Sequence, residues 1–259
     1  MTSWLKVPRA KKGEPAPRPL FFQATNTSYT TDFLGYFYAK MFASKANKEL
    51  HVYDTPISPG YGLIQNTFEH EEVNFVDSIL PSSISLSGQQ NRLLEFLVSL
   101  KSNDFHQGAQ EFLRWNPSML NTFQETIRLN DLESPASFHV GLHLARNIPI
   151  SLYISAIKQG ISKQGECSIF VMADSPDLLS EFRRRADKSW SIVDIPPPVS
   201  GRPGTRGALQ TYTNFLTGLY VLQQAPKVIS ALSSPVGKFL FLTNRSTFNS
   251  LDTNTFTFF

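Results

Sequence analysis

The stretch 167-CSIFVMADSPD-177 joins a continuous apolar run to a strong helix start. The run Cys167 to Ala173 is typical of a strand that is buried on both faces in a parallel sheet. Behind it, Ser175 can cap a helix, Pro176 fits the first helical turn, and Asp177 suits the positive end of the helix dipole. A buried strand that leads directly into a helix predicts an α/β fold.

The same alternation continues on both sides of this stretch, from residue 137 to residue 245. Strands are expected at 138–144, 190–195 and 227–232, and helices at 149–162, 207–223 and from Ser234-Pro235 through Phe241. Parallel strands connected by helices form doubly wound sheets, which bind nucleotides at the carboxyl ends of their strands. The second half of the chain is therefore expected to be such a sheet.

The first half begins with one βαβ unit. Residues 20–23 and 50–54 are expected to be parallel strands, with a helix at 31–45 between them, and further helices are expected at 90–101, 105–114 and 118–129. We thus expect an α/β protein of two Rossmann-like halves, 20–134 and 135–245. An extended basic, proline-rich arm at 1–19 precedes them, and a second arm at 246–259 follows.

Charge and composition exclude several classes of protein. The 259 residues carry a net charge of +3. The first 18 alone carry +4, because they contain five Lys and Arg residues and only one Glu. The folded body is therefore close to neutral and is not expected to bind nucleic acid. Cys167, the single cysteine, cannot form an internal disulfide, and no signal peptide or membrane span is evident. We expect a soluble protein of an intracellular, reducing compartment or of a virion.

Both arms are expected to contact other protein subunits. The first combines prolines with basic residues, and the second alternates small polar residues with five large apolar ones, namely Phe248, Leu251, Phe256, Phe258 and Phe259. Free segments of such composition do not order by themselves, and exposed aromatic rings are costly. A partner that covers them is the simplest explanation.

Five residues are candidates for binding a nucleotide. His143 and Arg146 follow the expected strand 138–144, where Arg146 could clamp a diphosphate; alternatively they are a packed histidine and an exposed loop arginine. Asp174 could accept hydrogen bonds from a ribose or base, or be an ordinary turn residue. Ser233 and Ser234 precede a helix that could hold phosphate, although Ser234 also suits a plain helix cap.

No metal site or covalent catalytic motif is evident. The five histidines, which are His51, His70, His106, His139 and His143, have no ligand spacing, and His70 beside Glu69 is expected to be a solvated, charged run. Neither a Gly-x-Ser-x-Gly elbow nor a Cys/His pairing is present. We therefore expect no metal or other cofactor.

Three segments together resemble the GT-B fucosyltransferases, the group of protein O-fucosyltransferases and α1,6-fucosyltransferases. Residues 140–147 (VGLHLARN) are similar to the family's donor motif, a strand ending in His-x-Arg-Arg-x-Asp, and residues 170–179 (FVMADSPDLL) are similar to its strand, Thr-Asp-Asp-Pro and helix. Residues 212–234 resemble its closing helix, strand and serine loop. The resemblance covers most of residues 20–245 and implies a GT-B fold and transfer of fucose from GDP-fucose.

The departures from the family fall on its donor-binding residues. Ala145 stands where the family has the arginine that binds the β-phosphate, and Ser175 stands where its second aspartate contacts guanine. Losing one such clamp removes about 2–4 kcal/mol of transition-state stabilisation. The leading hypothesis is therefore a degenerate, non-catalytic structural subunit of a larger assembly, such as a viral capsid or a multi-subunit complex.

The rival hypothesis is an active glycosyltransferase for fucose or another sugar. There, Arg146 would be the catalytic residue that holds the diphosphate, His143 and Asp174 would orient the donor, and Asp54 or Glu69 would be the base. A third possibility is nucleotide binding for regulation, without turnover.

Overall fold

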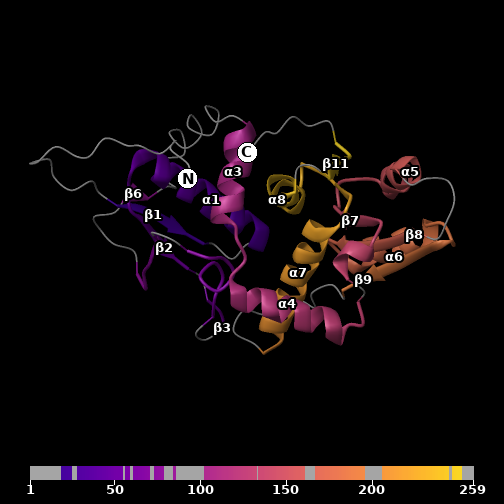
Figure 1. The fold of residues 1–259 in the computed structure, drawn as a ribbon, viewed down its shortest axis with the longest axis horizontal. Coiled ribbons are helices and arrows are strands. Elements are labelled where there is room, and N and C mark those ends of the chain that lie inside the picture. The colour runs from indigo at the N-terminus through magenta and orange to yellow at the C-terminus, as the bar shows by residue number, and fades with distance from the viewer. Residues whose placement is uncertain are drawn as a thin grey trace, which may run out of the picture. The chain divides into compact units, whose positions relative to one another are not determined.

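The computed structural model describes residues 19–24, 28–54, 56–58, 61–70, 73–78, 84–85, 102–132, 134–160, 167–195, 206–244 and 247–252. Most of the arm at 1–19, the helix expected at 90–101 and the end of the chain after residue 252 lie outside these ranges. Within them, no helix has the length and apolar character that crossing a membrane requires. The chain divides into two compact units, Met1–Pro56 with Gly60–Asn116, and Ile57–Pro59 with Pro117–Phe259 (Figure 1).

The first unit contains a parallel sheet of four strands in the order β5-β2-β1-β6. These are β1 (Leu20–Gln23), β2 (Leu50–Tyr53), β5 (Val73–Phe75) and β6 (Ile84–Ser85). The helix α1 (Tyr29–Ala46) connects β1 to β2, so the expected βαβ unit is confirmed. Asn47 ends α1 in the left-handed conformation, at φ 50°. Its backbone N–H donates to the carbonyl oxygens of Ala43 and Ser44. The first unit also contains β4 (Tyr61–Gly62) and α3 (Ser102–Phe112), whereas two of the three residues of β3 (Pro56–Ser58) belong to the second unit.

The second unit contains a five-stranded parallel sheet, which confirms the expected doubly wound fold. Its strands are β7 (Val140–Leu144), β8 (Cys167–Ala173), β9 (Trp190–Asp194), β10 (Val228–Ser230) and β11 (Phe248–Ser250). Their order is β11-β10-β7-β8-β9, so the chain first builds outward from β7 to one edge and then returns to build outward from its other side. The order reverses between β7 and β10, which is where doubly wound sheets bind their ligands.

Helices cover this sheet on both faces. They are α5 (Ile150–Gly160), α6 (Pro176–Arg185), α7 (Arg206–Gln224) and α8 (Pro235–Thr243), while α4 (Pro117–Leu129) packs against α7 and a short 3₁₀ turn η3 (Pro135–Ser137) precedes β7. Alternate residues of β7 take opposite faces. Val140 and Leu142 join the core of α5 and α6, whereas Gly141 lies against Leu222 of α7, with no room for a Cβ. His143, two residues after Gly141, shares its face.

Two segments differ from expectation. The expected boundary lay between residues 134 and 135, but α4 packs against α7 and belongs to the second unit, whose main part begins at Pro117. Part of the expected arm at 246–259 is also sheet, because Phe248–Ser250 pairs in parallel with Val228–Ser230. The physical reason is the open edge of β10, whose backbone groups need partners, together with an edge-to-face contact between Phe248 and Phe241 of α8.

Candidate functional site

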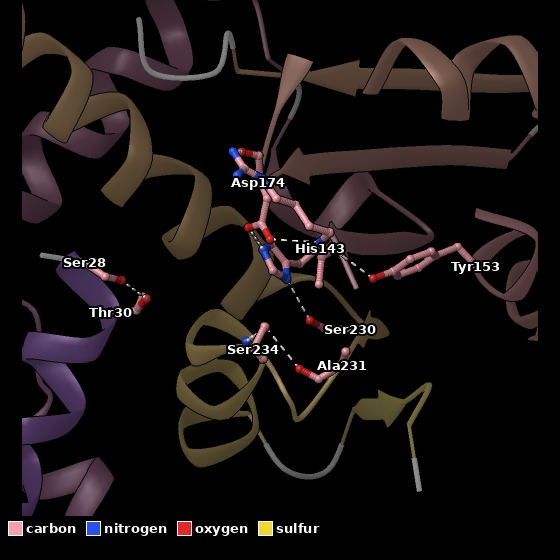
Figure 2. A network of polar contacts seen from close by, with 11 residues as sticks. Ser28, Thr30, His143, Tyr153, Asp174, Ser230, Ala231 and Ser234 are labelled. Atoms are coloured by element: carbon pink, nitrogen blue, oxygen red, sulfur yellow. Dashed lines mark hydrogen bonds and ion pairs between the residues drawn. The ribbon is translucent and has the colours of Figure 1, made fainter. Parts of the chain in front are cut away.

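His143 lies buried between the strands that flank the reversal of strand order. Its Nδ1 is 2.9 Å from Ser230 Oγ at the end of β10, and its Nε2 is 3.1 Å from Asp174 Oδ1 after the end of β8 (Figure 2). The ring is only 1% exposed. A carboxylate only accepts hydrogen bonds, so Nε2 carries the proton that faces Asp174. Both ring nitrogens are therefore engaged by the protein itself.

Asp174 is the centre of this network. Its Oδ1 faces His143, and its Oδ2 accepts the backbone N–H of Arg146 at 3.1 Å. Burial acts to raise the pKa of Asp174, but the hydrogen bond and charge of His143 and the backbone N–H and charge of Arg146 outweigh it and hold the pKa below its ordinary value. The carboxylate is therefore ionised at neutral pH and faces any anionic ligand with a negative charge.

Arg146 is exposed and donates a hydrogen bond to the loop after β8. Its Nη2 donates to the backbone oxygen of Asp174 at 3.3 Å. The preceding peptide is also held, because the N–H of Ala145 donates to the Tyr153 hydroxyl at 2.8 Å. Burial raises the pKa of Tyr153 to about 12, so this hydroxyl is neutral. The loop after β7 is thus tied to both β8 and α5.

The serine loop after β10 is closed by an aspartate from the end of the described chain. Oδ1 of Asp252 accepts the N–H of Leu232 at 2.8 Å, and Oδ2 accepts the N–H of Ser233 at 2.8 Å. The Ser233 hydroxyl accepts a hydrogen bond from Asn147 Nδ2 at 2.8 Å, and this bond joins the serine loop to the loop after β7. An internal carboxylate thus occupies two donors that a phosphate would need.

Ser234 caps α8. Its Oγ accepts the N–H of Gly237 at 2.8 Å, and its hydroxyl donates to the Ala231 carbonyl at 3.1 Å. Ser234 is therefore the N-cap of α8, which was the alternative interpretation of this residue. Ser175 likewise caps α6 through the N–H of Leu178.

A small cavity opens beside Asp174. It has a volume of about 180 Å³ and lies between the carboxyl half of β8 and α7, with Met172, Asp174, Leu179, Asn214 and Phe215 in its wall. The wall is mainly apolar, and Asp174 and Asn214 contribute its polar side chains.

Of the two residues considered as a catalytic base, Asp54 has a structural role. The carboxylate of Asp54 accepts the N–H groups of Ile64 and Gln65 at 2.8–3.0 Å, so it caps the turn after β4. Glu69 is exposed. The prediction that His70 belongs to a solvated, charged run is wrong for the histidine, because its ring is partly buried. Its Nδ1 lies 2.9 Å from the Tyr36 hydroxyl and its Nε2 3.0 Å from the Ile64 carbonyl.

Among the five expected site residues, the structure brings His143, Arg146 and Asp174 together and links Ser233 to them through Asn147. Sequence reasoning missed Ser230 and Asp252 as members of this network. Ser230 carried a signal, since it is a polar residue at the end of an otherwise apolar strand. Asp252 carried none, because its segment was taken for an arm. Across the part of the chain that the structure describes, no three His, Cys, Asp or Glu side chains gather as metal ligands would.

Comparison with solved structures identifies the fold. The fucosyltransferase NodZ from Bradyrhizobium matches with a TM-score of 0.58 at 11% identity, over 88% of this chain and 94% of that chain. The NodZ alpha-1,6-fucosyltransferase co-crystallized with GDP matches equally, over 88% and 93%. No family model and no curated protein sequence matches. The expected fucosyltransferase-like fold of GT-B type is thereby confirmed, while identity this low shows the fold alone.

Proposed function

We propose that this chain is a non-catalytic protein of fucosyltransferase-like fold that serves as a structural subunit of a larger assembly. One observation carries the proposal: the polar groups at the carboxyl edge of the second sheet are paired with one another. His143 holds Ser230 and Asp174, and Asp252 holds the N–H groups of Leu232 and Ser233. A ligand would have to replace these bonds rather than add to them, so its net gain is small.

Electrostatics at this edge support the same conclusion. A diphosphate placed beside the reversal point would meet two carboxylates, those of Asp174 and Asp252, both with pKa values held below the ordinary range. The fucosyltransferase family that this chain resembles has two arginines in its donor motif. Here only Arg146 remains, because Ala145 occupies the position of the first arginine. One exposed arginine that already bonds the Asp174 carbonyl supplies little stabilisation to a leaving diphosphate.

The activity half of this proposal is tested by turnover. Purified full-length chain is incubated with a panel of nucleotide sugars that includes GDP-fucose, and release of nucleotide is measured against Arg146→Ala and against buffer. We expect rates equal to the buffer rate for both proteins. Release that Arg146→Ala abolishes would overturn the proposal.

The assembly half rests on sequence outside the described residues. The proposed contacts are the arm at 1–19 and the aromatic residues Phe256, Phe258 and Phe259. Strand β11 removes Phe248 from this surface, since it pairs within the sheet. Replacing the three terminal phenylalanines with serine is expected to release the subunits that co-purify with the intact chain. Equal recovery of those subunits with both proteins would count against this contact.

The cavity beside Asp174 supports a second candidate function. An active glycosyltransferase would use a pocket at this edge of the sheet, and the exposed Arg146 lies on the same loop network. In that case GDP-fucose or another nucleotide sugar would be consumed with an Arg146-dependent rate. Binding of nucleotide without turnover would instead indicate a regulatory site.

A further inference from the structure

Asp252, which follows the edge strand β11, accepts several hydrogen bonds through its carboxylate. Its carboxylate accepts the N–H groups of Leu232 and Ser233, each at 2.8 Å, and the Ser250 hydroxyl at 2.7 Å. Burial acts to raise its pKa, but the bonds from Ser233, Ser250 and Leu232 outweigh burial and lower it. The group is therefore an ionised carboxylate held by three donors.

Two of these donors lie in the loop between β10 and α8, beside the reversal of strand order. Because Ser234 caps α8, the N–H groups of Leu232 and Ser233 are left for a partner outside the helix. Burial lowers the pKa of Lys238, in the first turn of α8, and the charge of Asp252 acts in the opposite direction. The two N–H groups of this loop therefore already hold one negative charge, that of Asp252.

The same carboxylate also fastens the edge strand. Strand β11 pairs with β10 over only three residues, and the next backbone bond runs from the N–H of Leu251 to the Ser230 carbonyl at 2.9 Å. Asp252 is the residue after Leu251, and its carboxylate accepts hydrogen bonds from the loop between β10 and α8. A three-residue strand at a sheet edge has few bonds of its own, so those of Asp252 are a large share of what holds it.

We propose that Asp252 is a latch that holds β11 on the sheet and closes the β10–α8 loop to anions, so that an anion bound at Leu232 and Ser233 and a docked β11 exclude each other. The chemical class of the competing ligand is a phosphate or diphosphate group, which would accept hydrogen bonds from the same two N–H groups. This inference goes beyond the proposed structural role and holds whether or not the chain turns over a sugar.

The test uses the full-length chain with Asp252→Asn, which keeps the size of the side chain and removes its charge. Asp187→Asn is the matched control, because Asp187 also accepts a backbone N–H and a serine hydroxyl, from Ser189, on an exposed turn of the same unit. Inorganic pyrophosphate is the probe. Hydrogen exchange is followed at the amides of Leu232, Ser233 and Leu251, and pyrophosphate binding by calorimetry.

We expect Asp252→Asn to speed exchange at the three amides on the order of 10-fold to 100-fold, as for the loss of hydrogen bonds to a charged group, and to bind pyrophosphate at least about tenfold more tightly than wild type. The control Asp187→Asn should match wild type in both measurements. Unchanged exchange at Leu251, or unchanged pyrophosphate affinity, would overturn the latch.

Wild-type protein supplies a second measurement in case Asp252→Asn does not fold. Increasing pyrophosphate, at matched ionic strength with chloride, should accelerate exchange at Leu251 as the anion displaces the carboxylate. Exchange at Leu251 that stays constant throughout the titration would contradict mutual exclusion. Neither outcome depends on GDP-fucose, so failure of the latch and failure of the proposed function are seen in separate experiments.

Discussion

His143 Nδ1 and Ser230 Oγ lie 2.9 Å apart and join β7 to β10, the two neighbouring strands between which the order of the sheet reverses. In doubly wound proteins this place is the opening of the ligand crevice. Here a buried imidazole and a buried hydroxyl meet across it, and Asp174 completes the line from the other side. The polar contacts at the opening are therefore contacts of the protein with itself.

Replacing His143 with leucine should destabilise the second unit. The change keeps a large side chain but leaves the Ser230 hydroxyl and one oxygen of Asp174 without their partner, which costs about 1–3 kcal/mol. Urea unfolding followed by circular dichroism measures the loss. His139→Leu, at an exposed position before β7, is the control and should change stability much less. Equal losses for the two variants would contradict the structural role of His143.

Asp174 should contribute acid-sensitive stability. Its pKa in the folded protein lies below the ordinary 3.8, so its contribution is fully present above that value and is lost as the pH falls from 3.8 through the lowered pKa. Asp174→Asn should therefore be less stable than wild type at neutral pH, and the difference should shrink below pH 3.8. Unfolding curves of the two proteins taken across this range measure the difference, and a difference that stays constant down to low pH would contradict the role given to Asp174.

His70 should make the first unit sensitive to mild acid. Burial lowers the pKa of the ring, and the charge of Lys40 acts in the same direction, against the hydrogen bonds to Ile64 and Gln65. The unfolded chain then binds a proton more readily, so stability is complete above pH 6.5 and falls as the pH drops from there through the lowered pKa. His70→Gln should flatten this part of the stability curve, as measured by urea unfolding at a series of pH values, and an unchanged slope would contradict the account.

Gly237 should tolerate no side chain. A Cβ there would lie 1.9 Å from the Ala231 carbonyl oxygen, so the first turn of α8 and the loop after β10 would have to separate. Gly237→Ala should cost about 1–3 kcal/mol of folding free energy. Gly218→Ala is the matched control, because its nearest contact is the flexible Met172 sulfur at 3.3 Å and alanine favours the helix. Thermal unfolding that ranks the two variants the other way would contradict the loop geometry.

Much of the fold was predictable because its signals are local. The strand Cys167–Ala173 has the predicted bounds, and the helix start at Ser175 follows from a cap and a proline. The βαβ unit at the start of the chain follows from periodicity in the same way. Strands β5, β6 and β11 were not expected, since two or three residues carry no detectable alternation and pair only because a neighbouring strand offers an open edge.

The site was predictable in part. His143, Arg146 and Asp174 were identified because they follow strands whose carboxyl ends must meet at one edge. Their mutual pairing depends on side-chain rotamers and on the register of β7 with β8, which aligns His143 with Met172 and Leu144 with Ala173. Asp252 depends on a long-range contact with Leu232 and Ser233, and no local pattern marks such a contact. His70 was misjudged because its acidic neighbours in sequence do not determine where its ring packs.

Calorimetric titration of the full-length wild-type chain with GDP tests the central claim most directly, because GDP carries the diphosphate that the crevice would have to hold. The account predicts at most weak binding of GDP, because a phosphate group would have to displace the Asp174 or Asp252 carboxylate from the donors at this edge. Tight, saturable binding of GDP that Arg146→Ala abolishes would contradict it.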